Sequence, residues 1–501
     1  MLFRSTAAYT QLEARFKRLA LVRESASLLE WDMQTLMPSG GAAARTEQLA
    51  ALSVMAHELL TDAKTGDLLN SAAAPNGLDA WQQANLRVMT REWRHASAVP
   101  ADLVEARSKA NSECEMRWRT ARPANDFKGL LPLLQRVLDL ARETAAAKGE
   151  ALGLDPYDAL IDQYEPGARQ AEITPLFDQL AGVLPDLITR ILDKQARGPA
   201  TRKPAGPFPA AKQMALARRL MEAVGFDFNH GRLDTSAHPF CSGVPDDIRM
   251  TTRWNEADFL PGLMGVLHET GHAMYERGLP QKWRSQPVGG ALGMGLHESQ
   301  SLIVEMQASR SRDFIAWLAP QAAEAFGGSG AEWSADNLVR IYGKVARSLI
   351  RVDADEVTYP CHIILRYRLE QALIGDQLKL GDLPGAWAEG MRALLDIVPT
   401  DDKDGCLQDI HWPGGGFGYF PSYTLGAMNA AQLFDAAKRA KPEIPASLGC
   451  GDFAPLMAWL RENVHSKGSL LNAHELLTEA TGKPLDPQVF LGHLRARYLD
   501  A

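Results

Sequence analysis

The sequence at residues 263–278 reads LMGVLHETGHAMYERG. Apolar residues recur in it at intervals of three and four, a spacing that predicts a helix. Residues i and i+4 are neighbours on one helix face, so His268 and His272 are expected to project side by side and hold one zinc ion. Glu269 is predicted to act as general base on water at the metal. The H-E-x-x-H pattern therefore indicates a zinc peptidase, and the alternative is two surface histidines beside a solvated glutamate.

A third metal ligand is expected in the segment GMGLHESQSLIVEMQASRSRDF, residues 293–314, which is predicted to be a second amphipathic helix. Catalytic zinc sites use three protein ligands and leave a position for water, and His,His,Glu is a known set. His297 and Glu298 diverge by about 100° around a helix, so one of them faces the metal. We predict Glu298, with His297 as the alternative. Glu305 is either the acceptor that orients a ligand histidine or part of a solvated face.

The composition excludes several classes of protein. The chain has 501 residues, of which 46% are hydrophobic and 23% charged, as in ordinary soluble proteins. A net charge of −8 argues against a nucleic-acid partner. No apolar run approaches the ~18–20 residues that span a bilayer, and the N-terminus lacks the pattern of a secretory signal. Five scattered cysteines without a C-x-x-C pair indicate reduced thiols, so we expect a cytoplasmic protein with no membrane partner.

Helical periodicity dominates the rest of the chain, which we interpret as one domain over residues 1–501. The Pro/Gly-rich segment 197–210 is either a lobe boundary or a surface loop. Residues 8–31 and 45–62, separated by a turn at 37–41, are predicted to pair as an antiparallel helical hairpin. Residues 248–254 alternate like a strand just before the H-E-x-x-H helix. Further helices are expected over 78–121, 127–152, 171–196 and 210–225.

Amide hydrolysis creates an oxyanion, which a neutral hydrogen-bond donor usually helps to stabilise. The segment WPGGGFGYFPSY, residues 412–423, interleaves glycine with aromatic residues. Its two tyrosines, Tyr419 and Tyr423, and the neighbouring His411 are candidate catalytic donors. The alternative for the tyrosines is that they are packed loop aromatics.

A substrate cut at its C-terminal end needs a cation for its carboxylate, and arginine can bond a carboxylate through two N–H groups. Arg351, Arg249 and Arg253 are the candidates. The alternative for each is a structural ion pair, which for Arg351 would involve the nearby Asp353 or Asp355.

Ten segments, in this order along the chain, are similar to the signature blocks of one family. They are WDMQTLMPSGGAAARTEQLA (31–50), PYDALIDQYEPG (156–167), HPF (238–240), DIRMTTR (247–253), HETGH (268–272), HESQS (297–301), IRVDAD (350–355), GCLQDIHW (405–412), GYFPSY (418–423) and HSKGSLLNAHELLTEATGKPL (465–485). Most of these strings are weak alone, but their order makes the set highly specific. Over nearly its whole length the chain resembles the M32 metallocarboxypeptidases of the carboxypeptidase Taq type.

The resemblance implies a mainly α-helical, saddle-shaped catalytic domain with a deep active-site groove. It implies a homodimer that releases single residues from the free C-termini of peptides with broad specificity. It also implies one divalent metal ion, zinc or cobalt. By position, His268, His272 and Glu298 would bind this ion, and Glu269 would be the general base or acid.

The resemblance also extends to the substrate site. Arg351, supported by Arg253, would hold the substrate carboxylate. His238 would line the catalytic centre on the substrate side. The remaining members of this lining would be His411, Tyr419 and Tyr423, and which tyrosine stabilises the oxyanion stays open.

Two other functions are alternatives at this point. A helical oligopeptidase or dipeptidyl carboxypeptidase shares H-E-x-x-H and a downstream glutamate, and peptides with amidated C-termini would separate it from a carboxypeptidase. A non-catalytic metal-binding scaffold would need a fourth protein ligand, and no cysteine near the motif supplies one.

Overall fold

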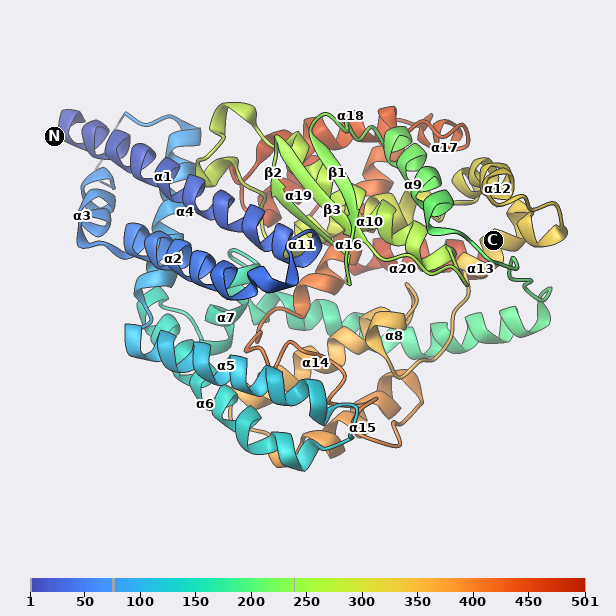
Figure 1. Cartoon of the computed structure of the whole chain (residues 1–501), viewed down its shortest axis with the longest axis horizontal. Helices are drawn as coiled ribbons and strands as arrows, with labels where there is room; N and C mark the ends of the chain where they lie inside the picture. Colours follow the sequence, from blue (N-terminus) through green and yellow to red (C-terminus); the bar gives the residue numbers. More distant parts are fainter. Residues whose placement is uncertain (1, 74–76, 238, 501) are drawn as a thin grey trace.

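The computed structural model describes residues 2–73, 77–237 and 239–500, and most of them are helical (Figure 1). In the described residues before the first strand, the regular elements are all helices. They are α1 (Leu2–Thr35), α2 (Ala42–Thr61), α3 (Ala63–Ala72), α4 (Ala80–Ser97), α5 (Ala101–Ala121), α6 (Phe127–Leu152), α7 (Pro156–Tyr164), α8 (Gln170–Arg197) and α9 (Ala210–Val224).

The second half opens with a small sheet and then returns to helices. Its elements are β1 (Gly231–Thr235), β2 (Phe240–Val244), β3 (Asp247–Thr252), α10 (Leu260–Gly278), α11 (Met294–Leu302), α12 (Arg312–Phe326), α13 (Ala335–Tyr342), α14 (Tyr359–Ile374), α15 (Leu383–Leu395), α16 (Pro421–Ala440), α17 (Ile444–Leu448), α18 (Ala454–Asn463), α19 (Ala473–Thr481) and α20 (Pro487–Arg495). The prediction of a mainly α-helical fold with a small β element before the H-E-x-x-H helix is confirmed.

The predicted N-terminal hairpin is present as α1 and α2, which pack on each other at one edge of the molecule (Figure 1). The predicted helix over 78–121 is wrong in one respect, because it is divided into α4 and α5. Pro100 lies at the break. It has no backbone N–H to donate and disfavours helical backbone at the residue before it. Pro100 therefore ends one helical run and stands as the N-cap of the next.

The sheet has the strand order β1-β3-β2, with β1 parallel and β2 antiparallel to β3. The predicted strand at 248–254 is present as β3, whose Ile248 and Met250 are buried. Both β2 and β3 pack against α10. β1 and β2 were not foreseen, since each has five residues and contains a glycine that weakens the strand pattern.

Helix α16 lies between two large hydrophobic cores. Leu433 and Phe434 belong to the core that also contains residues of α9, α10, α11 and α12. Leu425 and Met428 belong to the core formed with α6, α7, α8 and α14. Helices α1 to α4 have a smaller core of their own. The segment 197–210 joins α8 of one large core to α9 of the other, and whether this marks a domain boundary or the chain is one domain stays a prediction.

Two glycines allow α10, α11 and α16 to approach closely around the H-E-x-x-H helix. A Cβ atom at Gly271 would lie 2.4 Å from the carbonyl oxygen of Gln300 and 2.6 Å from the Cα of Ser301. A Cβ atom at Gly426 would lie 2.8 Å from the Cβ of Glu298. Contacts this close admit only glycine, so the spacing of the three helices depends on these positions.

We therefore expect Gly271→Ala to destabilise the protein by about 1–3 kcal/mol, because the new methyl group must displace α11. Gly265 on the same helix is the matched control, since a Cβ there meets nothing within 4 Å. Gly265→Ala should stabilise by about 0.5–1 kcal/mol through helix propensity. Urea unfolding of both variants measures the difference. Equal free energies of unfolding would contradict the close-approach argument.

The predicted helix over 293–314 is also interrupted. A π-helical turn over Ile303–Ser309 follows α11, and α12 begins anew at Arg312 with Ser311 as its N-cap. Short π segments inside helices occur frequently at functional sites. Here the π turn carries Glu305.

All five cysteines are free, as predicted. In the part of the chain that the structure describes, none of the helices is both long and apolar enough to cross a bilayer.

Candidate active site

His268 and His272 project from α10, and Glu298 reaches them from α11. One donor atom from each side chain can be chosen so that all three lie within 4.8 Å of one another, and no other such group of metal-ligating residues occurs within the described ranges. Oε2 of Glu298 is 3.7 Å from Nε2 of His268 and 3.5 Å from Nε2 of His272. The structure thus brings together the three residues that the sequence marked as metal ligands.

The Nδ1 atom of each of these histidines is held by another side chain. Nδ1 of His268 lies 2.9 Å from Oε2 of Glu305 and donates to it. His297 donates from Nε2 to Glu276 at 2.9 Å, so its own Nδ1 accepts from Nδ1 of His272 at 2.6 Å. Each ligand histidine therefore holds its Nδ1 in a hydrogen bond and directs Nε2 at Glu298, so a metal ion that binds can take the place of any proton on Nε2.

These contacts bear on two alternatives. His297 supports His272 from behind and is not the third member of the donor group. Glu305 is not part of a solvated face, since it is buried and contacts both His268 and Arg310, the latter at 2.5 Å. The π turn therefore supplies an acceptor for the first ligand histidine.

The electrostatic environment of the donor group favours a cation. Burial alone would lower the pKa of His268, but the carboxylates of Glu298 and Glu305 outweigh burial and raise it to about 10. The same negative charges would favour a divalent ion. Two imidazole nitrogens and one carboxylate oxygen suit zinc, and three protein ligands leave a coordination position for water. The residues present therefore fit a catalytic divalent metal.

Glu269 follows His268 on α10 and is buried, with 8% of its surface exposed. Burial raises the pKa of Glu269 to about 7, against the opposing effect of the His268 charge. The negative charge of Glu298 acts in the same direction as burial on the pKa of Glu269. A carboxyl group with a pKa near neutrality is suited both to accept and to return a proton.

Arg351 shares a cavity of about 340 Å³ with His268, Glu298 and Tyr423. Its side chain is almost fully buried, and its neighbour in the cavity wall is Tyr359, whose hydroxyl accepts a hydrogen bond from Nη1 at 2.7 Å. A guanidinium group and two of the three candidate metal ligands, His268 and Glu298, therefore line one cavity.

The ion pair of Arg351 is made with Asp409, not with Asp353 or Asp355. Nε and Nη2 of Arg351 lie 2.9 and 2.8 Å from Oδ1 of Asp409, while Arg366 approaches Oδ2 at 2.6 Å. Two guanidinium groups share one carboxylate, so a net positive charge remains. Asp409 and Tyr359 use three of the five N–H groups of Arg351, which leaves two for another acceptor.

Tyr423, Tyr419 and His411 form a cluster of uncharged side chains beside Arg351. Nε2 of His411 is 3.3 Å from the hydroxyl of Tyr423, and the two tyrosine rings are 5.3 Å apart. Burial raises the pKa of both tyrosines, so both are neutral phenols at neutral pH. Burial and the charge of Arg351 lower the pKa of His411 to about 4. Of the three residues, Tyr423 lines the cavity that holds His268 and Glu298.

The structure does not bring the other two arginine candidates into this cavity. Arg249 pairs with Asp247 at 2.7 Å and stacks on Trp31 at 4.6 Å, so it ties β3 to α1. Arg253 follows β3 and is exposed, and it does not line the cavity. His238 lies outside the described residues. The substrate-binding roles of these three residues stay predictions.

Two residues of the site were missed by sequence reasoning. Asp409 precedes His411 by two positions inside the segment GCLQDIHW, and that proximity was the available signal. Glu370 is fully buried and accepts hydrogen bonds from Trp412 Nε1 at 2.7 Å and from the Gly418 N–H at 2.9 Å, which holds the glycine-rich loop. Nothing near Glu370 in the sequence indicates this contact.

Comparisons with known proteins find relatives over nearly the whole chain. The family model described as carboxypeptidase Taq (M32) metallopeptidase matches residues 11–498. Thermostable carboxypeptidase 1 of Thermus thermophilus is 40% identical over 98% of both chains, and the protein of the same name from Pyrococcus furiosus is 34% identical over 98% of both.

Solved structures give the same result. Trypanosoma cruzi metallocarboxypeptidase 1 superimposes with a TM-score of 0.96 at 39% identity, covering 99% of this chain and 100% of that one. The M32 carboxypeptidase from Deinococcus radiodurans gives a TM-score of 0.93 at 34% identity, covering 99% of each. The match extends over nearly the full length in both sequence and fold. This chain therefore belongs to the M32 family of carboxypeptidase Taq metallopeptidases.

Proposed function

We propose that the protein is a zinc-dependent carboxypeptidase that releases single amino acids from the free C-termini of peptides with broad specificity. The observation that carries this proposal is the shared cavity of Arg351, His268 and Glu298. A guanidinium group with two N–H groups to spare would hold the terminal carboxylate. The last peptide bond would then lie at the metal ligands.

A zinc ion held by His268, His272 and Glu298 would polarise the peptide carbonyl and lower the pKa of water at the site. Glu269 takes the proton of the attacking water and returns it to the leaving amine. Its burial and its pKa of about 7 support this role. Tyr423 donates its O–H to the carbonyl oxygen as negative charge develops there.

The walls of the cavity support broad specificity. Leu302, Met306 and Ala427 line it together with Arg351. Leucine, methionine and alanine accept apolar side chains of different shapes, and methionine adapts by changing rotamer. The specificity therefore comes from the terminal carboxylate more than from the last side chain.

The test is digestion of a peptide ladder followed by mass spectrometry, with and without a chelator. We expect loss of one C-terminal residue at a time, abolished by the chelator and restored by zinc. Removal of residues in pairs would favour a dipeptidyl carboxypeptidase, and internal cuts would favour an oligopeptidase. Bound metal without turnover on any peptide would contradict the proposal. It would favour the alternative that the protein is a non-catalytic metal-binding scaffold.

Tyr423→Phe should lower kcat by roughly 10²–10³-fold with little change in KM, because one oxyanion donor is removed. Tyr419→Phe is the matched control, since Tyr419 packs edge-on against Tyr423 but does not line the cavity. Steady-state kinetics on a blocked dipeptide measures both. A larger loss of kcat in Tyr419→Phe than in Tyr423→Phe would assign the donor to Tyr419.

The homodimer, the cytoplasmic location and the choice of zinc over cobalt stay predictions. Sedimentation of the purified protein would test the first, cell fractionation the second, and metal analysis of protein purified without added metal the third.

A further inference from the structure

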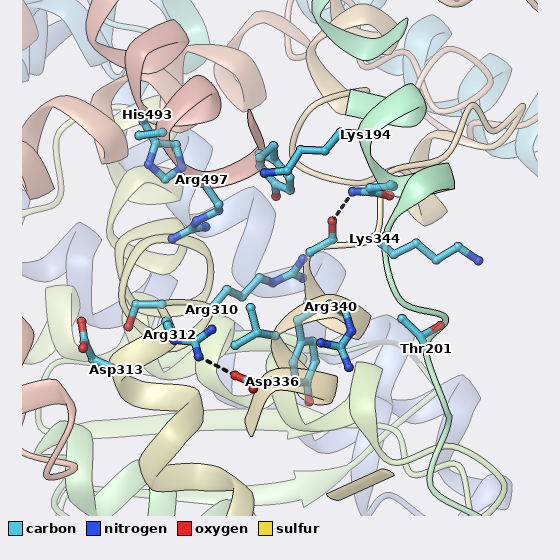
Figure 2. A pocket seen from close by; sticks show the side chains of 18 of the residues that line it. Lys194, Thr201, Arg310, Arg312, Asp313, Asp336, Arg340, Lys344, His493 and Arg497 are labelled. Carbon is cyan, nitrogen blue, oxygen red and sulfur yellow. Dashed lines mark hydrogen bonds and ion pairs between the residues drawn. The ribbon is translucent and has the colours of Figure 1, made fainter. Parts of the chain in front are cut away.

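A second cavity, of about 1070 Å³, lies on the far side of Arg310 from the active-site cavity, since Arg310 and Gln307 line both. Its wall includes the end of α8, residues 198–201 of the Pro/Gly-rich segment, the start of α12 and residues of α13 (Figure 2). Seven lysine or arginine residues line it but only two aspartates and no glutamate. In a chain of net charge −8, this is a local concentration of positive charge.

Part of this positive charge is not neutralised by protein carboxylates. Arg312 pairs with Asp336, and Arg310 pairs with Glu305. Arg340 on α13 and Lys344 just after it make no ion pair with any residue in the described ranges. Figure 2 shows Lys194, Arg310 and Arg340 reaching into the cavity region from different elements.

Two buried N–H groups at the cavity also need an acceptor. Nε of Arg310 and Nε of Arg340 are buried and have no hydrogen-bond partner among the described residues. A buried donor left without a partner costs about 1–3 kcal/mol, and more when it is charged. An anion in the cavity would reduce the repulsion between the cations, and a rotation of either guanidinium group towards it would give the buried N–H an acceptor.

We infer that this cavity is a binding site for an anion that carries two or more linked phosphate groups. Guanidinium groups match phosphate oxygens in pairs, and lysine adds point charges. Cations that approach from several sides match a ligand with several separated negative charges. They match a single small ion less well. Ser311 and Arg312, at the N-terminal end of α12, also line the cavity, and the helix dipole is positive there.

The test is isothermal titration calorimetry of the full-length metal-loaded protein with inorganic trimetaphosphate, which carries three linked phosphates and complexes divalent metals weakly. We expect saturable binding. The double variant Arg340→Ala/Lys344→Ala should weaken it by roughly tenfold or more, because two charge-assisted contacts are lost. The matched control is Lys128→Ala/Arg136→Ala, which removes the same charge from exposed positions on α6 and should bind like the wild type.

Lys344→Glu is a second variant, at an exposed position outside the helices, so it should fold normally and also lose binding. Neither Arg340 nor Lys344 lines the active-site cavity, so all three variants should keep peptidase activity. The inference is overturned if trimetaphosphate gives no saturable binding up to about 10 mM, a limit that corresponds to a free energy of only about −3 kcal/mol. It is also overturned if the Arg340→Ala/Lys344→Ala variant binds as tightly as the wild type.

Discussion

Glu269→Gln should lose peptide hydrolysis by roughly 10²–10⁴-fold while it keeps its metal. The amide has nearly the same size as the carboxylate, so the packing of α10 is preserved, but it accepts no proton at neutral pH. The donor group of His268, His272 and Glu298 does not include Glu269. Turnover of a blocked dipeptide and metal content by mass spectrometry are the two measurements.

Glu389→Gln is a control for this experiment, because Glu389 is an exposed glutamate on α15. It should change neither turnover nor metal content. If Glu269→Gln retained full turnover with metal bound, another group would carry the proton and the assigned role would be wrong. If it lost both metal and turnover, Glu269 would contribute to metal binding.

Arg351→Lys should remove the preference for a free C-terminus. Lysine keeps the charge but not the fork that bonds a carboxylate through two N–H groups. One or two charge-assisted hydrogen bonds are worth about 1.5–3 kcal/mol each, so kcat/KM for free-acid peptides should fall roughly 10–100-fold or more. Asp409 keeps its bond to Arg366, so the fold should tolerate the change.

Arg249→Lys is the matched control for Arg351→Lys. Arg249 was a candidate for the same role, yet it is held by Asp247 and Trp31 away from the cavity. The measurement is the ratio of kcat/KM for a peptide acid to that for its amide. This ratio should fall towards one in Arg351→Lys and should equal the wild-type ratio in Arg249→Lys. The reverse result would mean that Arg249, and not Arg351, holds the substrate carboxylate.

The parts of the site that were predictable from sequence are those set by local spacing. His268 and His272 share a helix face because they are four residues apart. The angle between successive helical residues indicated that only one of His297 and Glu298 faces the metal, and the known His,His,Glu set favoured Glu298. The α1–α2 hairpin follows in the same way from two apolar periodicities and a turn.

The parts that were not predictable depend on contacts between distant segments. Arg351 has two acidic neighbours in sequence, but its partner is Asp409, which only the packing of α14 and the glycine-rich loop brings close. Glu370 holds that loop through donors that are more than 40 residues away in sequence. Sequence spacing carries no information about such pairs.

The break between α4 and α5 and the π turn after α11 differ in how far the local sequence indicates them. The break between α4 and α5 is marked in the sequence by Pro100, because proline has no backbone N–H to donate. The π turn has no comparable signal in the sequence, since its residues, IVEMQAS, are compatible with an ordinary α-helix. The π turn exists where Glu305 meets His268, which is a tertiary contact.

The place of α16 limits how the molecule can open. This helix contributes side chains to both large cores, and its Gly426 rests against Glu298. A hinge movement of one core against the other would have to bend α16 between Met428 and Leu433, so we expect peptides to be admitted without such a movement. We expect the movements that accompany turnover to occur in elements outside these two cores. Helices α1 to α4, which have a core of their own, form the largest such group.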